Sequence, residues 1–99
     1  AMVDTGATAT VVTPRIVTQL GLSPVGSMSV NTPNAATPNA CYLYDVSVGF
    51  LPNRARISSV RVIAATLSGQ PIDCLIGRDI LAKGILVYIG YDNQFTLSF

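Results

Sequence analysis

The chain opens on Ala1-Met2-Val3-Asp4-Thr5-Gly6-Ala7-Thr8. Its first three residues are apolar and predict the end of a strand. Asp4-Thr5-Gly6 then breaks that strand, because glycine permits a tight turn. We therefore expect a carboxylate in a turn directly after a strand. Taken alone, this pattern requires no more than an Asx turn, in which the Asp4 side chain accepts a local backbone hydrogen bond.

A second stretch near the end of the chain reads Ile72-Asp73-Cys74-Leu75-Ile76-Gly77-Arg78-Asp79-Ile80-Leu81. Within it, Leu75 and Ile76 predict a short apolar strand that stops at Gly77. Residues 79–83 predict a helix of one or two turns, which Gly84 ends.

The rest of the chain indicates a mainly β protein. Thr13 is a good N-cap, Pro14 suits the first helical position and Gly21 suits the stop, so a short helix is expected between them. Hydrophobic alternation and β-branched residues favour strands at 10–12, 27–30, 42–50, 57–64, 85–89 and 95–99. Residues 31–39 are rich in turn formers, which predicts a hairpin with a long tip. Strands at such regular spacing favour a barrel or sandwich.

The composition excludes several kinds of site. The chain has no His, Glu or Trp, so it cannot build a Ser-His-Asp triad, a Cys-His pair or a His-based zinc site. Cys41 and Cys74 lack metal-ligand spacing, and we expect buried free thiols rather than a disulfide. We expect no metal or cofactor. If the protein is a hydrolase, an aspartate must carry the chemistry.

Charge and hydropathy exclude two kinds of partner. The formal net charge is only +1 and the arginines are scattered, so nothing predicts binding to nucleic acid. No apolar run approaches the roughly 20 residues of a membrane span, so no membrane contact is expected within this chain. The sequence does not indicate a cell compartment.

The two quoted stretches resemble motifs of the retropepsins, the retroviral-type aspartic proteases. Asp4-Thr5-Gly6-Ala7 is similar to their active-site signature, and Ile76-Gly77-Arg78-Asp79 to their late segment. The ending Phe95-Thr96-Leu97-Ser98-Phe99 is similar to the last strand of many members. The sequence pattern is most similar to that of bacterial and cellular members of the family.

The resemblance implies an all-β, retropepsin-like acid protease fold. We expect a closed β-barrel with one or two short helices, a flap hairpin within residues 27–50, and half of a homodimeric active site. Residues 1–99 would form a single domain that lacks the strands found upstream of the signature in the family. Either another segment fills the sheet edge left there, or the chain is incomplete.

The resemblance also assigns roles to individual residues. Asp4 would be the catalytic carboxylate, Thr5 would hydrogen-bond across the dyad, and Gly6 would let the substrate backbone approach. Predicted substrate contacts come from the floor of the cleft, the flap tip and a side-chain pocket: Gly6, Ala7, Thr8, Asn34, Ala35, Ala36, Thr37 and Ile76. We expect Arg78 and Asp79 to form a structural pair near the dimer interface. Viral members often carry an acidic residue where this chain has Thr8 or Ala9.

Two close carboxylates can hydrolyse a peptide bond, because they share one proton and so supply both a base and an acid. One Asp-Thr-Gly supplies half of this pair, and a two-fold axis between two Asp4 residues would supply the other half. The leading hypothesis is thus a homodimeric aspartic endopeptidase acting on polypeptides. The alternatives are a catalytically silent retropepsin-like module that binds peptides or dimerises, and an unrelated small β-barrel.

Overall fold

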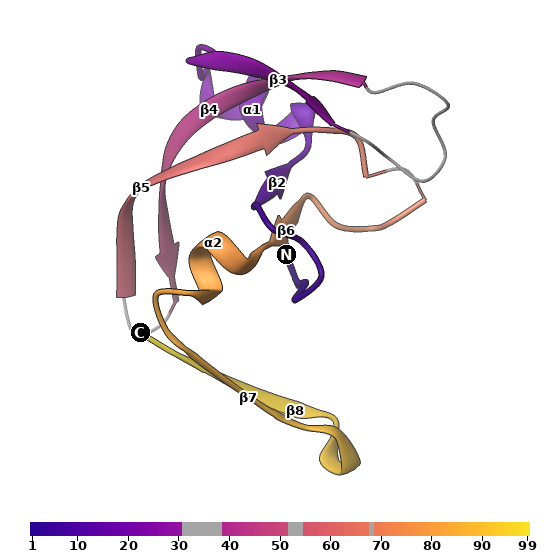
Figure 1. Ribbon diagram of the computed structural model, residues 1–99, viewed down its shortest axis with the longest axis vertical. Helices are drawn as coiled ribbons and strands as arrows, with labels where there is room; N and C mark the ends of the chain where they lie inside the picture. Colours follow the sequence, from indigo (N-terminus) through magenta and orange to yellow (C-terminus); the bar gives the residue numbers. More distant parts are fainter. Residues whose placement is uncertain (31–38, 52–54, 68) are drawn as a thin grey trace.

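The computed structural model describes residues 1–30, 39–51, 55–67 and 69–99. Its main element is a six-stranded sheet in the order β1-β6-β2-β5-β4-β3, beside a separate two-stranded sheet of β7 and β8 (Figure 1). The strands are β1 (Met2–Val3), β2 (Val11–Val12), β3 (Gly26–Val30), β4 (Asn39–Phe50), β5 (Ala55–Ala64), β6 (Cys74–Ile76), β7 (Ile85–Ile89) and β8 (Gln94–Ser98). The helices are α1 (Pro14–Leu20), α2 (Arg78–Leu81) and the 3-10 turn η1 (Gly90–Asp92).

The expected strands and helices are confirmed. α1 begins at Pro14 after Thr13, and Gly21 ends it with a φ of 65°, a left-handed conformation that glycine adopts without strain. Thr13 holds the N-cap position, but its hydroxyl donates to Asp73 Oδ1 (2.9 Å) instead of capping the helix. β3 and β4 form the predicted antiparallel hairpin. Its predicted tip, which includes Asn34, Ala35, Ala36 and Thr37, lies outside the described residues.

The core lies between the main sheet and the two helices. Buried aliphatic side chains and one tyrosine from β2, α1, β4, β5, β6 and α2 pack into one cluster, which comprises Val12, Val17, Tyr44, Val60, Val62, Ile76 and Ile80. Val62 and Ile80 are fully buried. The cluster joins α2 to β5 and β6, and so fixes the late segment against the centre of the sheet.

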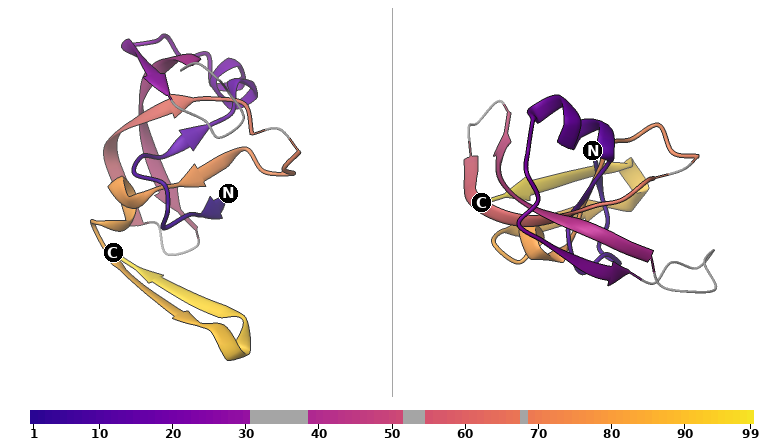
Figure 2. Two further views of the ribbon diagram at one scale, coloured as in Figure 1. Left: turned by 45° about the vertical axis from the view of Figure 1, so that its right-hand side comes forward. Right: turned by 90° about the horizontal axis from the view of Figure 1, so that it is seen from above.

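The prediction of a closed barrel is wrong. β1 and β3 are the two edges of the main sheet, and they do not pair with each other. Closure requires every strand to have two neighbours. β1 is only two residues long and pairs with β6, and β7 and β8 pair only with each other. The sheet is therefore curved but open (Figure 2).

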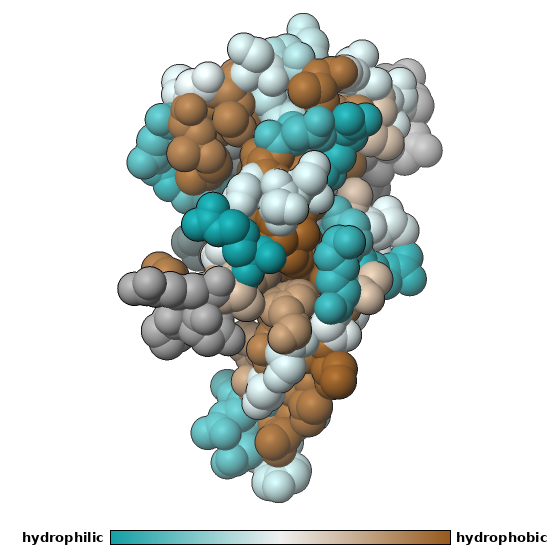
Figure 3. Space-filling view, turned by 90° about the vertical axis from the view of Figure 1, so that its left-hand side faces the viewer, coloured by the Kyte–Doolittle hydropathy of each residue, from teal (hydrophilic) through white to brown (hydrophobic). Residues whose placement is uncertain are grey.

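The β7–β8 hairpin projects away from the main sheet (Figure 2). Register places Tyr88 opposite Phe95 and Leu86 opposite Leu97, so these apolar side chains share one face. Tyr88 is 69% exposed and Phe95 is 59% exposed. The space-filling view shows hydrophobic surface along this projecting end (Figure 3). At the hairpin base Phe99 stacks on Phe50 of β4, with ring centroids 4.8 Å apart.

The late segment passes close to the backbone of Ala9 and Thr10 at Gly77. A Cβ built on Gly77 would lie 2.5 Å from the carbonyl carbon and oxygen of Ala9 and 3.0 Å from the nitrogen of Thr10. These are backbone atoms that cannot move aside as a side-chain end could. The late segment can therefore cross residues 4–10 this closely only because position 77 has no side chain.

We expect Gly77→Ala to destabilise the fold by about 1–3 kcal/mol or more, because the new methyl group overlaps backbone atoms. Gly49→Ala is the matched control, since a Cβ on the exposed Gly49 of β4 meets nothing within 4 Å. Its effect should be about 0.5 kcal/mol or less. Urea unfolding of both variants measures the difference, and equal midpoints would contradict the close crossing.

Candidate active site

Asp4 lies in a turn directly after β1, as its sequence context predicts. The backbone N–H of Asp4 donates to the carbonyl oxygen of Ile76 (2.9 Å), which ties the turn to β6. The N–H of Ala7 donates to the carbonyl oxygen of Asp4 (3.2 Å) and closes the turn. The carboxylate is thus held at the end of a paired strand.

The Asp4 carboxylate is held at one oxygen. Oδ1 accepts the backbone N–H of Gly6 at 2.9 Å, which is the Asx-type contact. A Cβ on Gly6 would lie 3.2 Å from this same oxygen, so a side chain there would crowd the carboxylate. Among the described residues, no ion pair involves Asp4 and no hydrogen bond reaches its Oδ2. One carboxylate oxygen is oriented and the other is available.

The residues after Asp4 form an accessible surface. Thr5, Gly6 and Thr8 are exposed and Ala7 is half-buried. The carbonyl oxygen of Ala7 accepts the N–H of Arg78 (2.8 Å). These residues lie consecutively in the same short loop, whereas the predicted substrate contacts of the flap tip, residues 34–37, lie outside the described residues. We call residues 4–10 the Asp4 loop.

Ile76 belongs to this site through its backbone. Ile76 is only 8% exposed and its side chain is buried in the core. Its carbonyl oxygen accepts the backbone N–H of Asp4. The predicted contact between the Ile76 side chain and a substrate remains a prediction.

The far end of the Asp4 loop is fixed by a buried hydroxyl. Thr10 is 1% exposed, and its Oγ1 donates to Asp79 Oδ1 at 2.7 Å. Its backbone N–H donates to Asp79 Oδ2 at 3.0 Å. Its hydroxyl oxygen accepts the N–H of Gly77 at 3.1 Å. The late segment therefore contacts the loop near its beginning, middle and end.

This arrangement was not predicted from the sequence. Asp79 was expected to pair with Arg78, yet in the described part of the chain neither residue is in a salt bridge, and Asp79 bonds Thr10 instead. The available signal was the hydroxyl of Thr10 next to the apolar strand Val11–Val12. A buried hydroxyl requires a partner, but sequence alone does not identify it.

Two other aspartates have arginine partners. Arg61 donates to Asp45 across β4 and β5 (2.9 and 3.1 Å) and lowers the pKa of Asp45. Arg15 and then Thr13 hydrogen-bond Asp73 and lower its pKa. Asp92 lies in the exposed η1 turn. In the described residues, none of these carboxylates forms a cluster with Asp4. No group of three potential metal ligands is present among those residues.

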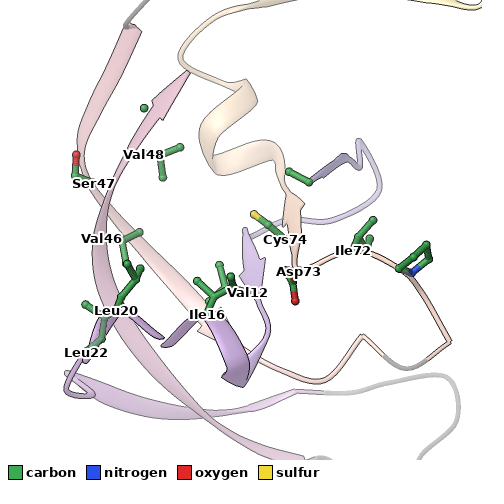
Figure 4. A pocket seen from close by; sticks show the side chains of 13 residues that line it. Val12, Ile16, Leu20, Leu22, Val46, Ser47, Val48, Ile72, Asp73 and Cys74 are labelled. Atoms are coloured by element: carbon green, nitrogen blue, oxygen red, sulfur yellow. The ribbon is translucent and has the colours of Figure 1, made fainter. Parts of the chain in front are cut away.

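Both cysteines are free, as predicted, and both are half-buried. Burial raises the pKa of the Cys74 thiol, which disfavours a reactive thiolate. Cys74 lines a largely apolar cavity of about 480 Å³ with residues of α1 and β4, including Ile16, Val46 and Val48 (Figure 4). No residue of the turn 4–6 lines this cavity, so it is separate from the candidate active site.

A second cavity borders the Asp4 loop. It measures about 450 Å³ and lies between β1, Thr5 and the apolar face of the hairpin. Its walls include Met2, Val3, Leu86, Tyr88 and Phe95. The exposed face of the β7–β8 hairpin is therefore continuous with the surface next to Asp4.

In the described residues, no helix has the length and apolar character needed to cross a membrane. No curated protein matches the chain. Among solved structures, its fold is similar to that of a retropepsin-like aspartic protease from Rickettsia conorii, with a TM-score of 0.67. The two share 17% sequence identity, and the match covers 98% of this chain and 70% of the other. At this identity the likeness shows the fold alone.

The family described as aspartyl protease has a model that matches residues 1–80. That span contains both the Asp4 loop and the late segment that crosses it. The chain therefore belongs to the aspartyl protease family, with a retropepsin-like fold.

Proposed function

We propose that this protein is an aspartic endopeptidase that works as a homodimer, with one Asp4 from each chain. The observation that carries the proposal is the set of contacts made by the Asp4 carboxylate. Its carboxylate is oriented by Gly6 at one oxygen and free at the other, and the remaining described aspartates are engaged or distant in the fold. A second carboxylate must then come from another molecule, and a second copy of the chain supplies an identical one.

The chemistry follows from two facing carboxylates that share one proton. The ionised Asp4 accepts a proton from a water molecule, whose oxygen attacks the carbonyl carbon of the peptide bond. The protonated Asp4 of the other chain donates its proton to the carbonyl oxygen. When the tetrahedral intermediate collapses, the C–N bond breaks and the amine nitrogen takes a proton from the first carboxyl group. The carboxylate of the other chain takes a proton back from a hydroxyl group of the intermediate, so the pair again shares one proton. Thr5 of each chain would bond across the dyad and hold both carboxylates in place.

The β7–β8 hairpin is the proposed pairing surface. Its apolar face shares a cavity with Thr5, so a partner seated there would approach the Asp4 loop. Exposed apolar surface of this kind marks interaction sites. A two-fold arrangement uses the same surface on both copies, which suits a site made of two identical halves.

The proposed substrate is an extended polypeptide. Gly6, Ala7 and Thr8 form the accessible part of the Asp4 loop and would contact its backbone, while the predicted flap residues 34–37 would close over it. Apolar residues around the loop favour hydrophobic substrate side chains on each side of the cleaved bond.

We expect Asp4→Asn to abolish cleavage of an unfolded protein substrate between mildly acidic and neutral pH. The amide keeps the size of the side chain but cannot take a proton from water, and loss of a general base lowers rates by about 100-fold or more. The measurement is the appearance of peptide fragments by mass spectrometry.

Asp45→Asn is the control for this test, because Asp45 pairs with Arg61 on the exposed strand face. It should cleave at the parent rate. Cleavage by Asp4→Asn at that same rate would disprove the proposed catalytic role. Absence of cleavage by every form would favour the silent peptide-binding or dimerisation module.

We expect Tyr88→Ala to weaken dimerisation about 10-fold or more, because aromatic residues in the centre of an interface often dominate its affinity. Tyr42→Ala is the matched control, since Tyr42 is 61% exposed and Tyr88 is 69% exposed, but Tyr42 lies on β4. Sedimentation velocity across a range of concentrations gives both dissociation constants. Equal constants for the two variants would place the interface elsewhere.

A further inference from the structure

We propose that the two β7–β8 hairpins of the dimer pack tip to base, with each Asp92 against the partner's Lys83. The inference rests on the homodimer of the proposed function and adds the orientation in which the two copies meet. The occupant of the exposed hairpin face is thus a second copy of this chain. Three features of the hairpin support this orientation: its charges, its apolar face and its position beside the Asp4 loop.

The hairpin has one charged side chain at each end. In residues 83–99 the only charged side chains are Lys83, which lies at the base just after α2, and Asp92, which lies in η1 at the tip. Both are exposed, and in the described part of the chain neither is in an ion pair. The five-residue strand β7 separates them by about 17 Å. This exceeds the Debye length of roughly 8 Å at physiological salt, so each charge can respond to a partner independently.

Two copies of the hairpin can align face to face in two ways. If they run in the same direction, Asp92 lies beside the partner's Asp92, and Lys83 lies beside the partner's Lys83. If they run in opposite directions, each Asp92 lies beside the partner's Lys83. Like charges held close together cost free energy and opposite charges lower it, and a two-fold axis makes every such contact occur twice. The charges therefore favour hairpins that run in opposite directions.

The apolar face between the two charges favours the same arrangement. Leu86 is paired with Leu97 nearer the base, and Tyr88 is paired with Phe95 nearer the tip. When the hairpins run in opposite directions, the aromatic pair of one copy packs on the leucine pair of the other. Large side chains then meet smaller ones at both levels, so the interface has an even width and can pack closely. Hairpins that run in the same direction would stack aromatic on aromatic and leave a gap between the leucines.

The position of the Asp4 loop fits this axis. In the opposed arrangement the two-fold axis crosses the hairpin near its middle, between the leucine pair and the aromatic pair. Tyr88 and Phe95 border the same cavity as Thr5, so an axis through this part of the hairpin passes close to Thr5 of both copies. The two Asp4 loops then lie on either side of the axis, as a shared pair of carboxylates requires.

Charge reversal tests the pairing. Lys83→Glu or Asp92→Lys alone would create two like-charge contacts in the dimer, and we expect each to weaken dimerisation about 10-fold at low salt. The combined variant restores opposite charges and should return the dissociation constant to within about threefold of the parent value. In roughly 1 M salt the differences should largely disappear, because the Debye length falls to about 3 Å. Sedimentation velocity over a range of concentrations gives the constants.

The two single variants control for net charge. Reversing one charge shifts the formal net charge by two, from +1 to −1 in Lys83→Glu and from +1 to +3 in Asp92→Lys. Overall repulsion between two copies depends on the magnitude of that charge. It would therefore weaken the dimer of Asp92→Lys and leave that of Lys83→Glu unchanged, whereas a local pair weakens both.

Cysteine crosslinking reports the orientation directly. A disulfide requires Cα atoms within about 7 Å of each other. An oxidised mixture of Lys83→Cys chains and Asp92→Cys chains should therefore form a covalent dimer that contains one chain of each kind. Asp92→Cys alone should form no more covalent dimer than the parent, whose two half-buried free thiols set the background. Mass spectrometry of the linked peptides identifies the joined positions.

The outcomes separate this inference from the proposed function. If the parent dimerises but Lys83→Glu dimerises equally well, the combined variant stays weak, or Asp92→Cys links to itself, the tip-to-base pairing is wrong and the dimer stands. If the parent remains monomeric at every concentration, both the dimer and the pairing are wrong. If the dimer forms but no form cleaves a substrate, the endopeptidase proposal fails, and the dissociation constants and crosslinks still decide the pairing.

Discussion

The structure depends on one backbone crossing, where the late segment passes directly against the Asp4 loop. Gly77 makes it possible, because any side chain there would overlap the backbone of Ala9 and Thr10. Once the two segments are this close, their backbone groups pair, and Asp4, Ala7 and Thr10 each gain a partner from residues 76–79. The position of Asp4 is therefore a property of two distant segments and not of its own turn alone.

The molecule divides into a body with a core and a hairpin without one. The body packs its buried side chains around Val62 and Ile80, whereas the hairpin leaves apolar residues such as Tyr88 and Phe95 exposed. A domain of this size buries a limited fraction of its surface, so a second copy covering the hairpin would add burial that the single chain lacks. In the proposed dimer, the same association that completes the pair of carboxylates would also cover this face.

Charge in this protein is arranged so that Asp4 differs from Asp45, Asp73 and Asp79. Asp45 and Asp73 each face an arginine that lowers their pKa, which favours the ionised form. Asp79 is surrounded by hydrogen-bond donors from the late segment and from Thr10. Asp4 receives one backbone donor and no described cation.

Local features could be predicted because they depend on neighbouring residues. Strand alternation, the Pro14 and Gly21 boundaries of α1, and the turn at Asp4-Thr5-Gly6 depend on neighbouring residues, so they could be predicted without the fold. The closed barrel and the Arg78–Asp79 pair were predicted wrongly, and the bond between Thr10 and Asp79 was missed. Strand closure and the partners of buried polar groups depend on segments far apart in the chain, and a sequence pattern carries no distance between them. Only the tertiary structure, by bringing Gly77 against Ala9, decided which carboxylate holds the loop and which one is left free.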